Sequence, residues 1–330
     1  MGLRGYIAKK IFFALIAFVI AITVVFFLYH VIPGNPANIF ATDRTVNPEQ
    51  RENLLERWGL NEPLWKQYGI FLRNLLQGDL GFSYLHKLPV SEVIGISLPW
   101  TLLLLGTSFV LNAVIGIFLG AFVAWRRGSK LDTGFVLTYN FYNAIPLFFV
   151  GMLFIALFSF YSRKWGWPFY FPAYGAQTAG SSEWGFFPHL VDILWHLVLP
   201  LTVLTIAGIL GWSWFMRGNL INILTEDYIK TARAKGLNEN QVLYRHAFRN
   251  AILPVVTNIG MSIGGLIGGA VLIETVFSYP GTGRMLYEAL IRHDYPLVQG
   301  AFIIISGLTL LGLLLAEIVY GFIDPRIRTS

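Results

Sequence analysis

The sequence predicts an all-α membrane protein with six transmembrane helices. Hydrophobic residues make up 55% of the 330 residues and charged residues only 13%, a balance that a soluble fold of this size does not show. The apolar residues also come in uninterrupted blocks, whereas a soluble core would spread them at helix or strand period. Barrel strands are about half as long and alternate in polarity, so a transmembrane β-barrel is excluded.

Six blocks are each near or above the roughly 20 residues needed to cross a bilayer. They are residues 11–31, 99–125, 134–161, 195–216, 253–276 and 297–323. None of the 24 Lys and Arg residues falls inside a block, as expected when a cation buried in lipid costs several kcal/mol. Glu274 and Glu317 are the only acids inside the blocks, and neither has an obvious partner in the sequence.

The cations outside the blocks favour one side of the membrane. They gather in the N-terminus, in the loops after the second and fourth blocks and in the tail, which predicts a multi-pass protein of the cell membrane with both termini cytoplasmic. The first block is too long for a signal peptide, so residues 1–31 are expected to be a cytoplasmic N-terminus and a retained first helix. The net charge of +6 follows from this bias, and no basic stripe interleaved with aromatic residues indicates a nucleic-acid partner.

Residues 32–98 are expected to form a small extracellular helical segment. Residues 47–50 (NPEQ) supply an N-cap, a first-turn proline and a capping Gln, and Gly59 is expected to stop this helix. A second helix is expected to begin near Asn61 and to end at Gly78. Its apolar face comprises Leu64, Tyr68, Phe71, Leu72, Leu75 and Leu76. Residues 162–194, rich in Gly, Pro and aromatic residues, are expected to be irregular.

Residues 99–330 are expected to form a core of five membrane helices, with a cytoplasmic loop at 217–252. The loop is expected to hold two short helices joined by a sharp bend. Thr225 would cap the first and Gly236 would end it in a left-handed conformation, while Asn238 and Gln241 would cap the second. Such a rigid protrusion suits a protein partner. The alternative is an amphipathic segment on the lipid surface, which the loop's Lys and Arg residues favour.

A glycine-rich stretch follows this loop inside the fifth block. Its small residues recur at four-residue spacing: Gly260, Gly264, Gly265, Gly268 and Gly269. This spacing allows helices to approach closely, so the stretch is expected to be a helix-packing face, a moving interface or a pore wall.

Several kinds of chemistry are missing from the sequence. There is no G-x-x-x-x-G-K-[ST] phosphate loop, no H-E-x-x-H motif and no cysteine, so neither ATP binding by a P-loop, nor a metal site, nor a thiolate nucleophile is expected in this chain. The G-x-S-x-G around Ser262 lies inside an apolar block, where packing is a better explanation than a hydrolase elbow. His189 and His196 are expected to form hydrogen bonds near the outer surface rather than to share a metal.

The loop's own sequence is the most specific feature. Residues 228–237 (YIKTARAKGL), continuing through 245–247 (RHA) and 249–251 (RNA) to Leu253-Pro254, resemble the coupling loop, or EAA loop, of ABC-importer permeases in the oligopeptide/dipeptide/nickel branch. Four further pieces resemble the same branch in order: residues 33–36 (PGNP), 68–84 containing GDLG, 274–281 (ETVFSYPG) and 324–326 (DPR). The long segment after the first helix resembles the member of the permease pair that carries this insertion. Residues 230–232 (KTA) stand where the broad family has Glu-Ala-Ala, so no role is carried over for that Glu.

The resemblance implies the type I ABC-importer permease architecture and a set of partners. These are a second homologous permease chain, two P-loop ATPase subunits that hold ATP and Mg, an extracellular substrate-binding protein and membrane lipid, with no cofactor bound by this chain itself. It implies peptides as substrate, with oligosaccharides or, less favoured, nickel as alternatives. The competing classes are a secondary transporter or channel, which would show polar residues at mid-membrane or inverted repeats, and a membrane enzyme.

In this family the loop docks into a groove on the ATPase. The resemblance therefore implies a docking core of Ala234, Gly236, Leu237, Asn238 and Val242. Arg245 and Arg249 would make flanking charge contacts, and their alternative role is positive-inside topology or binding of lipid headgroups.

Overall fold

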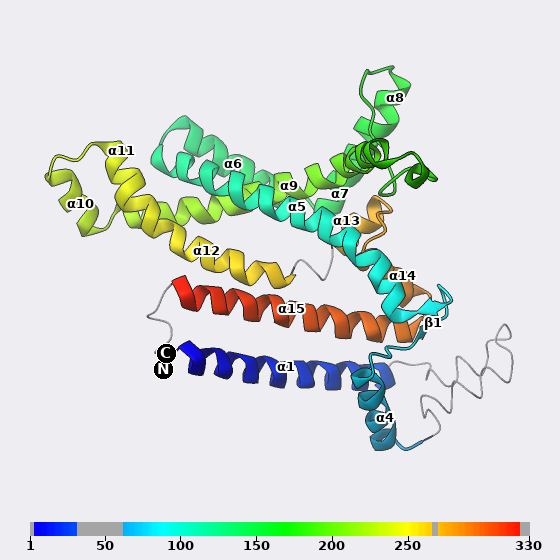
Figure 1. Cartoon of the computed structure of the whole chain (residues 1–330). Helices are drawn as coiled ribbons and strands as arrows, with labels where there is room; N and C mark the ends of the chain where they lie inside the picture. The colour runs from blue at the N-terminus through cyan, green and yellow to red at the C-terminus, as the bar shows by residue number, and fades with distance from the viewer. Residues whose placement is uncertain (1–2, 32–61, 266–269, 324–330) are drawn as a thin grey trace.

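The computed structural model describes residues 3–31, 62–265 and 270–323. Within these ranges the regular structure is almost entirely helical, and long helices lie side by side in roughly one direction (Figure 1). The strand pair in this part is a short antiparallel hairpin of β1 (Phe82–Ser83) and β2 (Leu88–Pro89). The expected all-α membrane class is therefore confirmed.

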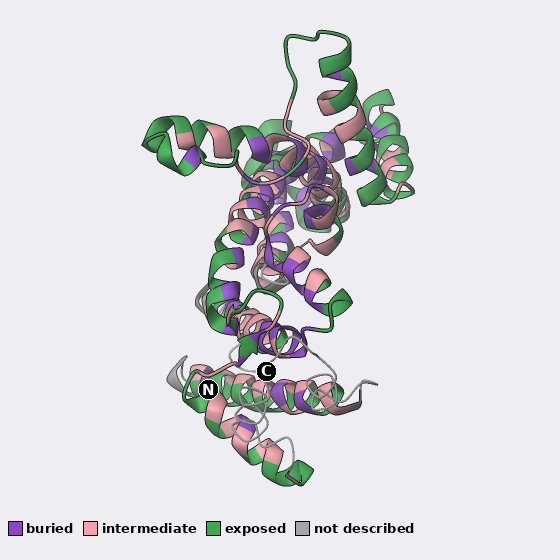
Figure 2. Cartoon of the chain, turned by 90° about the vertical axis from the view of Figure 1, so that its right-hand side faces the viewer, coloured by how far each residue is buried: buried purple, intermediate pink, exposed green. Residues whose placement is uncertain are grey.

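Five helices in the described ranges are long and apolar enough to cross a bilayer. They are Gly5–His30, Val90–Trp125, Leu147–Lys164, Phe186–Leu224 and Tyr295–Ile318. Many of their large apolar side chains are exposed, and Figure 2 shows exposed residues along the outer faces of the helices and buried residues where helices meet. Lipid, rather than water, is the solvent that suits such faces.

Helices α1 (Leu3–Val31) and α15 (Tyr295–Ile323) lie side by side, with the first residues of α1 next to the last residues of α15 (Figure 1). Lys10 Nζ pairs with Glu317 Oε1 at 2.8 Å, and the Tyr6 hydroxyl donates to the Glu317 carbonyl at 3.2 Å. Glu317 therefore has a partner, which the sequence alone did not reveal. The cation comes from the first turns of α1, which extend before the expected span.

Helix α4 (Leu64–Leu76) matches the second helix expected in the extracellular segment, and Gly78 after it has the left-handed φ of 76°. Its apolar face packs Phe71 against Phe26 of α1, and the Tyr68 hydroxyl lies 2.7 Å from that of Thr23. Leu64 and Leu76, at the ends of the same face, are exposed. The helix expected to start at residue 47 and to stop at Gly59 lies outside the described residues.

The most extensive helix packing joins α5 (Val90–Trp125) and α9 (Phe186–Leu224). Gly116 and Gly120 of α5 face α9 so closely that an added Cβ would lie under 3.0 Å from Trp212 or from the backbone of Ser213. Both helices are longer than the expected spans 99–125 and 195–216. Helix α9 includes residues 186–194, which were expected to be irregular, and Arg217, which was expected in the loop.

The third expected span, 134–161, is wrong as a single helix. It consists of α6 (Lys130–Asn143), a break at residues 144–146, and α7 (Leu147–Ile155), which continues through a π-helical turn, η1 (Ala156–Tyr161), into α8 (Ser162–Lys164). Pro146 has no backbone N–H and sits at the break with an extended ψ of 129°. Residues 165–180 then form the irregular segment expected from the sequence.

The fifth expected span, 253–276, is also divided. Helix α12 (Phe248–Gly265) and the short helix α13 (Val271–Val276) are separate, and residues 266–269 between them lie outside the described ranges. A further helix, α14 (Thr282–Ile291), follows α13 before α15.

Glu274 of α13 is completely buried and has the hydrogen-bond partners that the sequence did not reveal. Its carboxylate accepts a hydrogen bond from the Thr101 hydroxyl of α5 at 2.8 Å and another from the Arg284 backbone N–H at 3.0 Å. The second bond satisfies a backbone N–H group in the first turn of α14. Such groups have no partner within their own helix, and a carboxylate near the helix N-terminus can accept from them. Glu274 therefore holds α13 and α14 against α5.

Candidate functional site

A helical projection extends from the end of the molecule at which α1 begins and α15 ends (Figure 1). We call residues 226–241 the projection. Helix α10 (Asp227–Ala234) runs outward, Gly236 reverses the chain with a left-handed φ of 79°, and α11 (Glu239–Gln241) runs back. An added Cβ at Gly236 would have open space, so the left-handed backbone, and not crowding, is what favours glycine here.

Helix α11 starts with the capping box expected from the sequence. The Asn238 side chain accepts from the Gln241 backbone N–H at 2.9 Å, and the Gln241 side chain accepts from the Asn238 backbone N–H at 3.2 Å. The cap expected for the first helix is wrong by one residue: Thr225 ends α9 and its hydroxyl donates to the Asn222 carbonyl at 2.6 Å, so Glu226 takes the N-cap position of α10.

The expectation of a second short helix is wrong. Helix α11 continues without a break through the π-helical turn η3 (Val242–Ala247) into α12, so helical structure is unbroken from Glu239 to Gly265. The other arm of the projection follows α9 directly, with two residues between Leu224 and Asp227. Displacement of the projection therefore acts directly on α9 and α12.

The projection is fixed to the membrane helices by its own apolar core. Ile229 of α10 and Val242 and Ala247 of η3 are fully buried, and they pack in one cluster with Met216 and Leu220 of α9. This packing makes the bend stiff, because α10 cannot tilt without opening the core.

The residues expected to form the docking core divide into two groups. Ala234, Gly236 and Asn238 are exposed at the tip, and Leu237 is half-buried against the apolar core. Val242 is fully buried, so it supports the projection from inside and has no surface to offer a partner. The docking core expected from the sequence therefore needs correction at this one residue.

The flanking surface carries unpaired cations and exposed aromatic rings. Arg245 and Arg249 are exposed, and neither forms an ion pair with a residue in the described ranges. Tyr244 is 68% exposed beside them, and Tyr228 is 41% exposed and accepts a hydrogen bond from Asn250 at 3.0 Å. The sequence interpretation missed both tyrosines. For Tyr244 the available signal was a large aromatic residue directly before Arg245, in the second turn of the helix that Asn238 caps.

The glycine-rich stretch begins in α12, which packs against α15. An added Cβ at Gly260 would lie 3.0 Å from the Ala316 Cβ, so this glycine does allow close approach. Gly264 and Gly265 end the described part of α12, and Gly268 and Gly269 lie outside the described ranges. Ser262 is in the helix and its hydroxyl donates to the Asn258 carbonyl at 2.8 Å, which agrees with packing and not with a hydrolase turn.

Neither histidine considered as a metal ligand belongs to a metal-binding group. His189 Nε2 lies 2.7 Å from the Gln177 side-chain oxygen, and His196 Nδ1 lies 2.9 Å from the Asp192 carbonyl. No group of three or more His, Asp or Glu residues that could hold a metal occurs within the described ranges.

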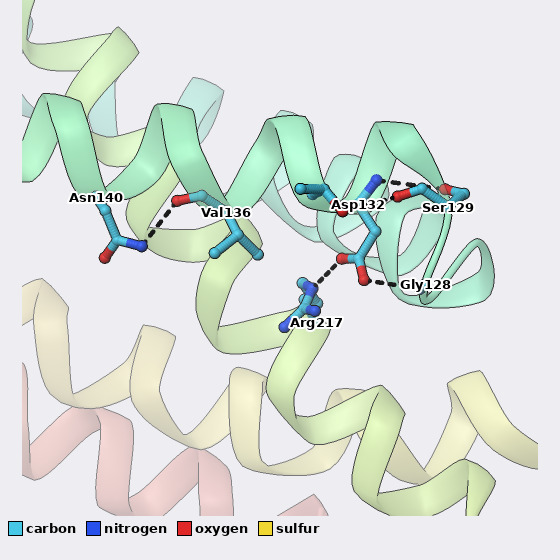
Figure 3. Close-up of polar contacts among 7 residues, drawn as sticks. Gly128, Ser129, Asp132, Val136, Asn140 and Arg217 are labelled. Carbon is cyan, nitrogen blue, oxygen red and sulfur yellow. Dashed lines mark hydrogen bonds and ion pairs between the residues drawn. The ribbon is translucent and has the colours of Figure 1, made fainter.

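An ion pair joins α6 to α9 near the projection (Figure 3). Arg217 Nε donates to Asp132 Oδ1 at 2.7 Å, and the Gly128 backbone N–H donates to the other carboxylate oxygen at 2.9 Å. The hydrogen bond from Arg217 lowers the pKa of the Asp132 carboxyl, and the Asp132 side chain is only 9% exposed. The Arg217 guanidinium also lies over the Trp214 ring, which stacks on Tyr139 of α6 with ring centroids 4.5 Å apart.

The bundle of apolar helices and the projection define a multi-pass membrane protein. Two family models match the sequence. The model of the inner membrane component of binding-protein-dependent transport systems matches residues 116–329, and the model of the N-terminal region of such components matches residues 3–105. The chain belongs to this family of membrane permeases.

Relatives match over almost the whole chain. The oligopeptide transport system permease protein AppB of Bacillus subtilis is 38% identical over 328 residues, covering 99% of this chain and 100% of AppB. The dipeptide transport system permease protein DppB of Escherichia coli K12 is 38% identical and covers 94% of each chain. The oligopeptide transport system permease protein OppB of Haemophilus influenzae is 34% identical, over 98% of this chain and 99% of OppB.

Proposed function

We propose that this chain is one of two permease subunits of an ATP-driven importer and forms half of the path through which peptides enter the cell. The observation that carries the proposal is the projection, a capped bend stiffened by a buried core. Its tip is exposed, and the cations on its flank form no ion pair with the residues that the structure describes. The relatives of this chain are named as permeases of peptide transport systems. A surface of this kind suits a groove on another protein.

The partners in this proposal follow from the division of labour in a binding-protein-dependent system. A second homologous permease chain completes the path. Two P-loop ATPase subunits bind ATP and Mg, and each of them binds one projection. An extracellular binding protein delivers the peptide. Closure of the ATPases moves the projections. Because each projection is continuous with α9 and α12, this motion changes which side of the path is open.

The proposed docking surface comprises Ala234, Gly236, Leu237 and Asn238 at the tip, with Tyr244, Arg245 and Arg249 on the flank. Tyr244 supplies a large, rigid apolar surface, and the two arginines supply charge. These are the residue types that contribute most to binding at protein interfaces.

In this proposal the projection and both termini lie in the cytoplasm. The start of α1, the end of α15 and the turn between α5 and α6 are at the same end of the molecule as the projection (Figure 1). That turn contains Arg126 and Arg127, and the projection adds further cations. An excess of Lys and Arg on one side supports assignment of that side to the cytoplasm.

The experiment uses the complete complex reconstituted in liposomes, with binding protein and ATP. We expect uptake of labelled peptide that requires ATP hydrolysis. Uptake of oligosaccharide or nickel in place of peptide would refute the proposed substrate, and uptake driven by an ion gradient without ATPase subunits would refute the proposed class.

The coupling role is tested by Gly236→Val. A β-branched residue in the left-handed region costs roughly 1–2 kcal/mol or more, so the bend should open and uptake should be lost while the chain still inserts into the membrane. The matched control is Gly180→Val, because Gly180 has a φ of 81° and open space around it but lies far from the projection. Equal loss of uptake in both variants would contradict the coupling role.

The flank is tested by Tyr244→Ala. Loss of an exposed aromatic anchor should weaken the association of the ATPase subunits by roughly 1–2 kcal/mol, or about tenfold in Kd. Tyr287→Ala is the control, because Tyr287 is a half-exposed tyrosine on α14, at the other end of the molecule. Unchanged association after Tyr244→Ala would remove this residue from the docking surface.

A further inference from the structure

The break between α6 and α7 lies beside a cavity of about 370 Å³. One wall is formed by Tyr139, Tyr142, Asn143 and Pro146, and the opposite wall by Leu210 and Gly211 of α9. Residues 210–211 are near the middle of α9, and the 14 residues of α6 place Asn143 about 20 Å from the start of that helix at a rise of roughly 1.5 Å per residue. The cavity therefore lies deep within the membrane-crossing part of the molecule.

The break exposes hydrogen-bonding groups that an unbroken helix would satisfy. The backbone carbonyls of Ala144 and Ile145 accept no hydrogen bond from the residues that the structure describes. The Asn143 side chain is exposed and is likewise without a partner among them. The Tyr139 ring stacks on Trp214, and Tyr139 lines the same cavity.

Hydrocarbon cannot solvate such groups. Each unsatisfied polar group in the bilayer core costs several kcal/mol, so a broken helix at membrane depth occurs where it lines a wet cavity or is covered by protein. The break is exposed on the surface of this chain, as Asn143, Ala144 and Pro146 show. Water, a transported molecule or a protein partner must therefore face it.

We propose that the break lines the translocation path and hydrogen-bonds the main-chain amides of a peptide in transit. The inference rests on the proposed function for the peptide itself. The residues that line the cavity offer both partners that an amide needs: Ile145 has a carbonyl acceptor without a partner among the described residues, and the side chains of Asn143 and Tyr139 can donate.

The chemistry of the lining favours the backbone of the peptide over its side chains or its charged ends. None of the nine lining residues is charged, so the cavity has no counter-ion for a terminal ammonium or carboxylate or for a charged side chain. Every peptide presents the same main-chain amides, so such a cavity passes many sequences and leaves selection to the delivery protein. Weak, neutral contacts also let the peptide leave.

The first test measures ATP-driven uptake by the full complex with Asn143→Ala. Loss of one neutral hydrogen bond to the moving peptide should lower uptake about fivefold, without change in binding of peptide to the extracellular binding protein. The matched control is Asn140→Ala on the same helix. Asn140 donates to the Val136 carbonyl at 2.9 Å and does not line the cavity, so its removal should leave uptake within about twofold (Figure 3).

The second test uses the absence of cysteine from this chain. Asn143→Cys should react with a charged, membrane-impermeant thiosulfonate in the transporting complex, and excess peptide should slow the reaction. Phe141→Cys is expected to stay unreactive, because Phe141 is 72% exposed and two residues from Asn143, so it points to the opposite side of the same helix, away from the cavity. Labelling is measured as the increase in mass of this chain alone.

Two outcomes would overturn the inference while the proposed function stands. In a complex that imports peptide, a cysteine at position 143 that never reacts would show that a protein partner covers the break. One that reacts equally with and without peptide would show a wet cavity that peptide does not enter. A complex that imports no peptide at all would overturn the inference together with the proposed substrate.

Discussion

The ion pair between Asp132 and Arg217 gives the sharpest stability prediction. Its oxygen and nitrogen are 2.7 Å apart, and the two side chains are 9% and 16% exposed, so solvent screens the interaction little. Replacing Arg217 by Met leaves the Asp132 carboxylate buried and, among the described residues, with only the hydrogen bond from the Gly128 backbone N–H. Breaking a buried pair by removing one member costs about 3 kcal/mol, and we expect that loss here.

The measurement is the apparent Tm of the purified complex in lipid nanodiscs at a fixed scan rate. For a chain of this size, about 3 kcal/mol corresponds to a downward shift of roughly 6 °C. The control is Lys230→Met, which removes a pair whose side chains are 67% and 95% exposed and should move Tm by about 1 °C at most. The double variant Asp132→Leu with Arg217→Met should recover most of the loss, because no buried charge is then left alone.

The same pair predicts a pH dependence. Because the folded chain lowers the pKa of Asp132 below its unfolded value, the contribution is fully present above the unfolded pKa and is lost as pH falls through the folded one. The difference in Tm between wild type and Arg217→Met should therefore be constant around neutral pH and shrink in strong acid. A double variant whose loss equals the sum of the two single losses would refute a coupled pair, as would a single loss no larger than the Lys230 control.

Two further predictions concern other tight contacts. Gly120→Ala should destabilise the complex by roughly 2–3 kcal/mol, because the added Cβ would meet the backbone of Ser213. The control Gly106→Ala, in the same helix, has open space around the added Cβ and should be neutral or stabilise by about 0.5–1 kcal/mol. Equal Tm values for the two variants would show that α5 and α9 can separate freely. Glu274→Ala should cost about 2–3 kcal/mol, because it leaves the Arg284 backbone N–H at the start of α14 without its acceptor and removes one partner of the Thr101 hydroxyl, which keeps its contacts with Thr282. Glu288→Ala removes only a half-exposed ion pair and should change stability by less than about 1 kcal/mol; similar losses of Tm would contradict a special role for Glu274.

Features governed by neighbours in sequence could be predicted well. The capping box of Asn238 and Gln241, the left-handed Gly236 and the end of α4 at Gly78 each depend on residues within one helical turn. Such signals need no knowledge of the rest of the fold. The position of the projection and of its exposed tip followed from them.

Features governed by distant contacts could not be predicted. Pro99, Pro200 and Pro254 lie inside continuous helices, whereas Pro146 marks a break, and nothing adjacent to these prolines in the sequence separates the two outcomes. Packing against other helices decides whether the lost hydrogen bond ends a helix. The partner of Glu274 is a threonine 173 residues away in sequence, which no local pattern indicates.

The glycines illustrate the same limit. Gly116 and Gly120 have the same four-residue spacing as the stretch from Gly260 onward, and they are positions at which α5 approaches α9 closely, but only the later stretch was singled out from the sequence. The spacing shows that close packing is allowed, and the facing helix decides where it is used. The burial of Val242 was missed for a related reason: its position near the tip of the loop in sequence does not reveal that α9 covers it.

The projection and the proposed path share helix α9, and this connection limits how the two can move. The end of α9 packs Met216 and Leu220 into the core of the projection, while its middle, at Leu210 and Gly211, forms a wall of the cavity. Helix α6 forms the other wall and is tied to α9 by the Asp132–Arg217 pair near the projection. A force on the projection therefore moves α9 together with the first turn of α6, which contains Asp132. The break at residues 144–146 is the point at which α7 can change its angle to these two helices.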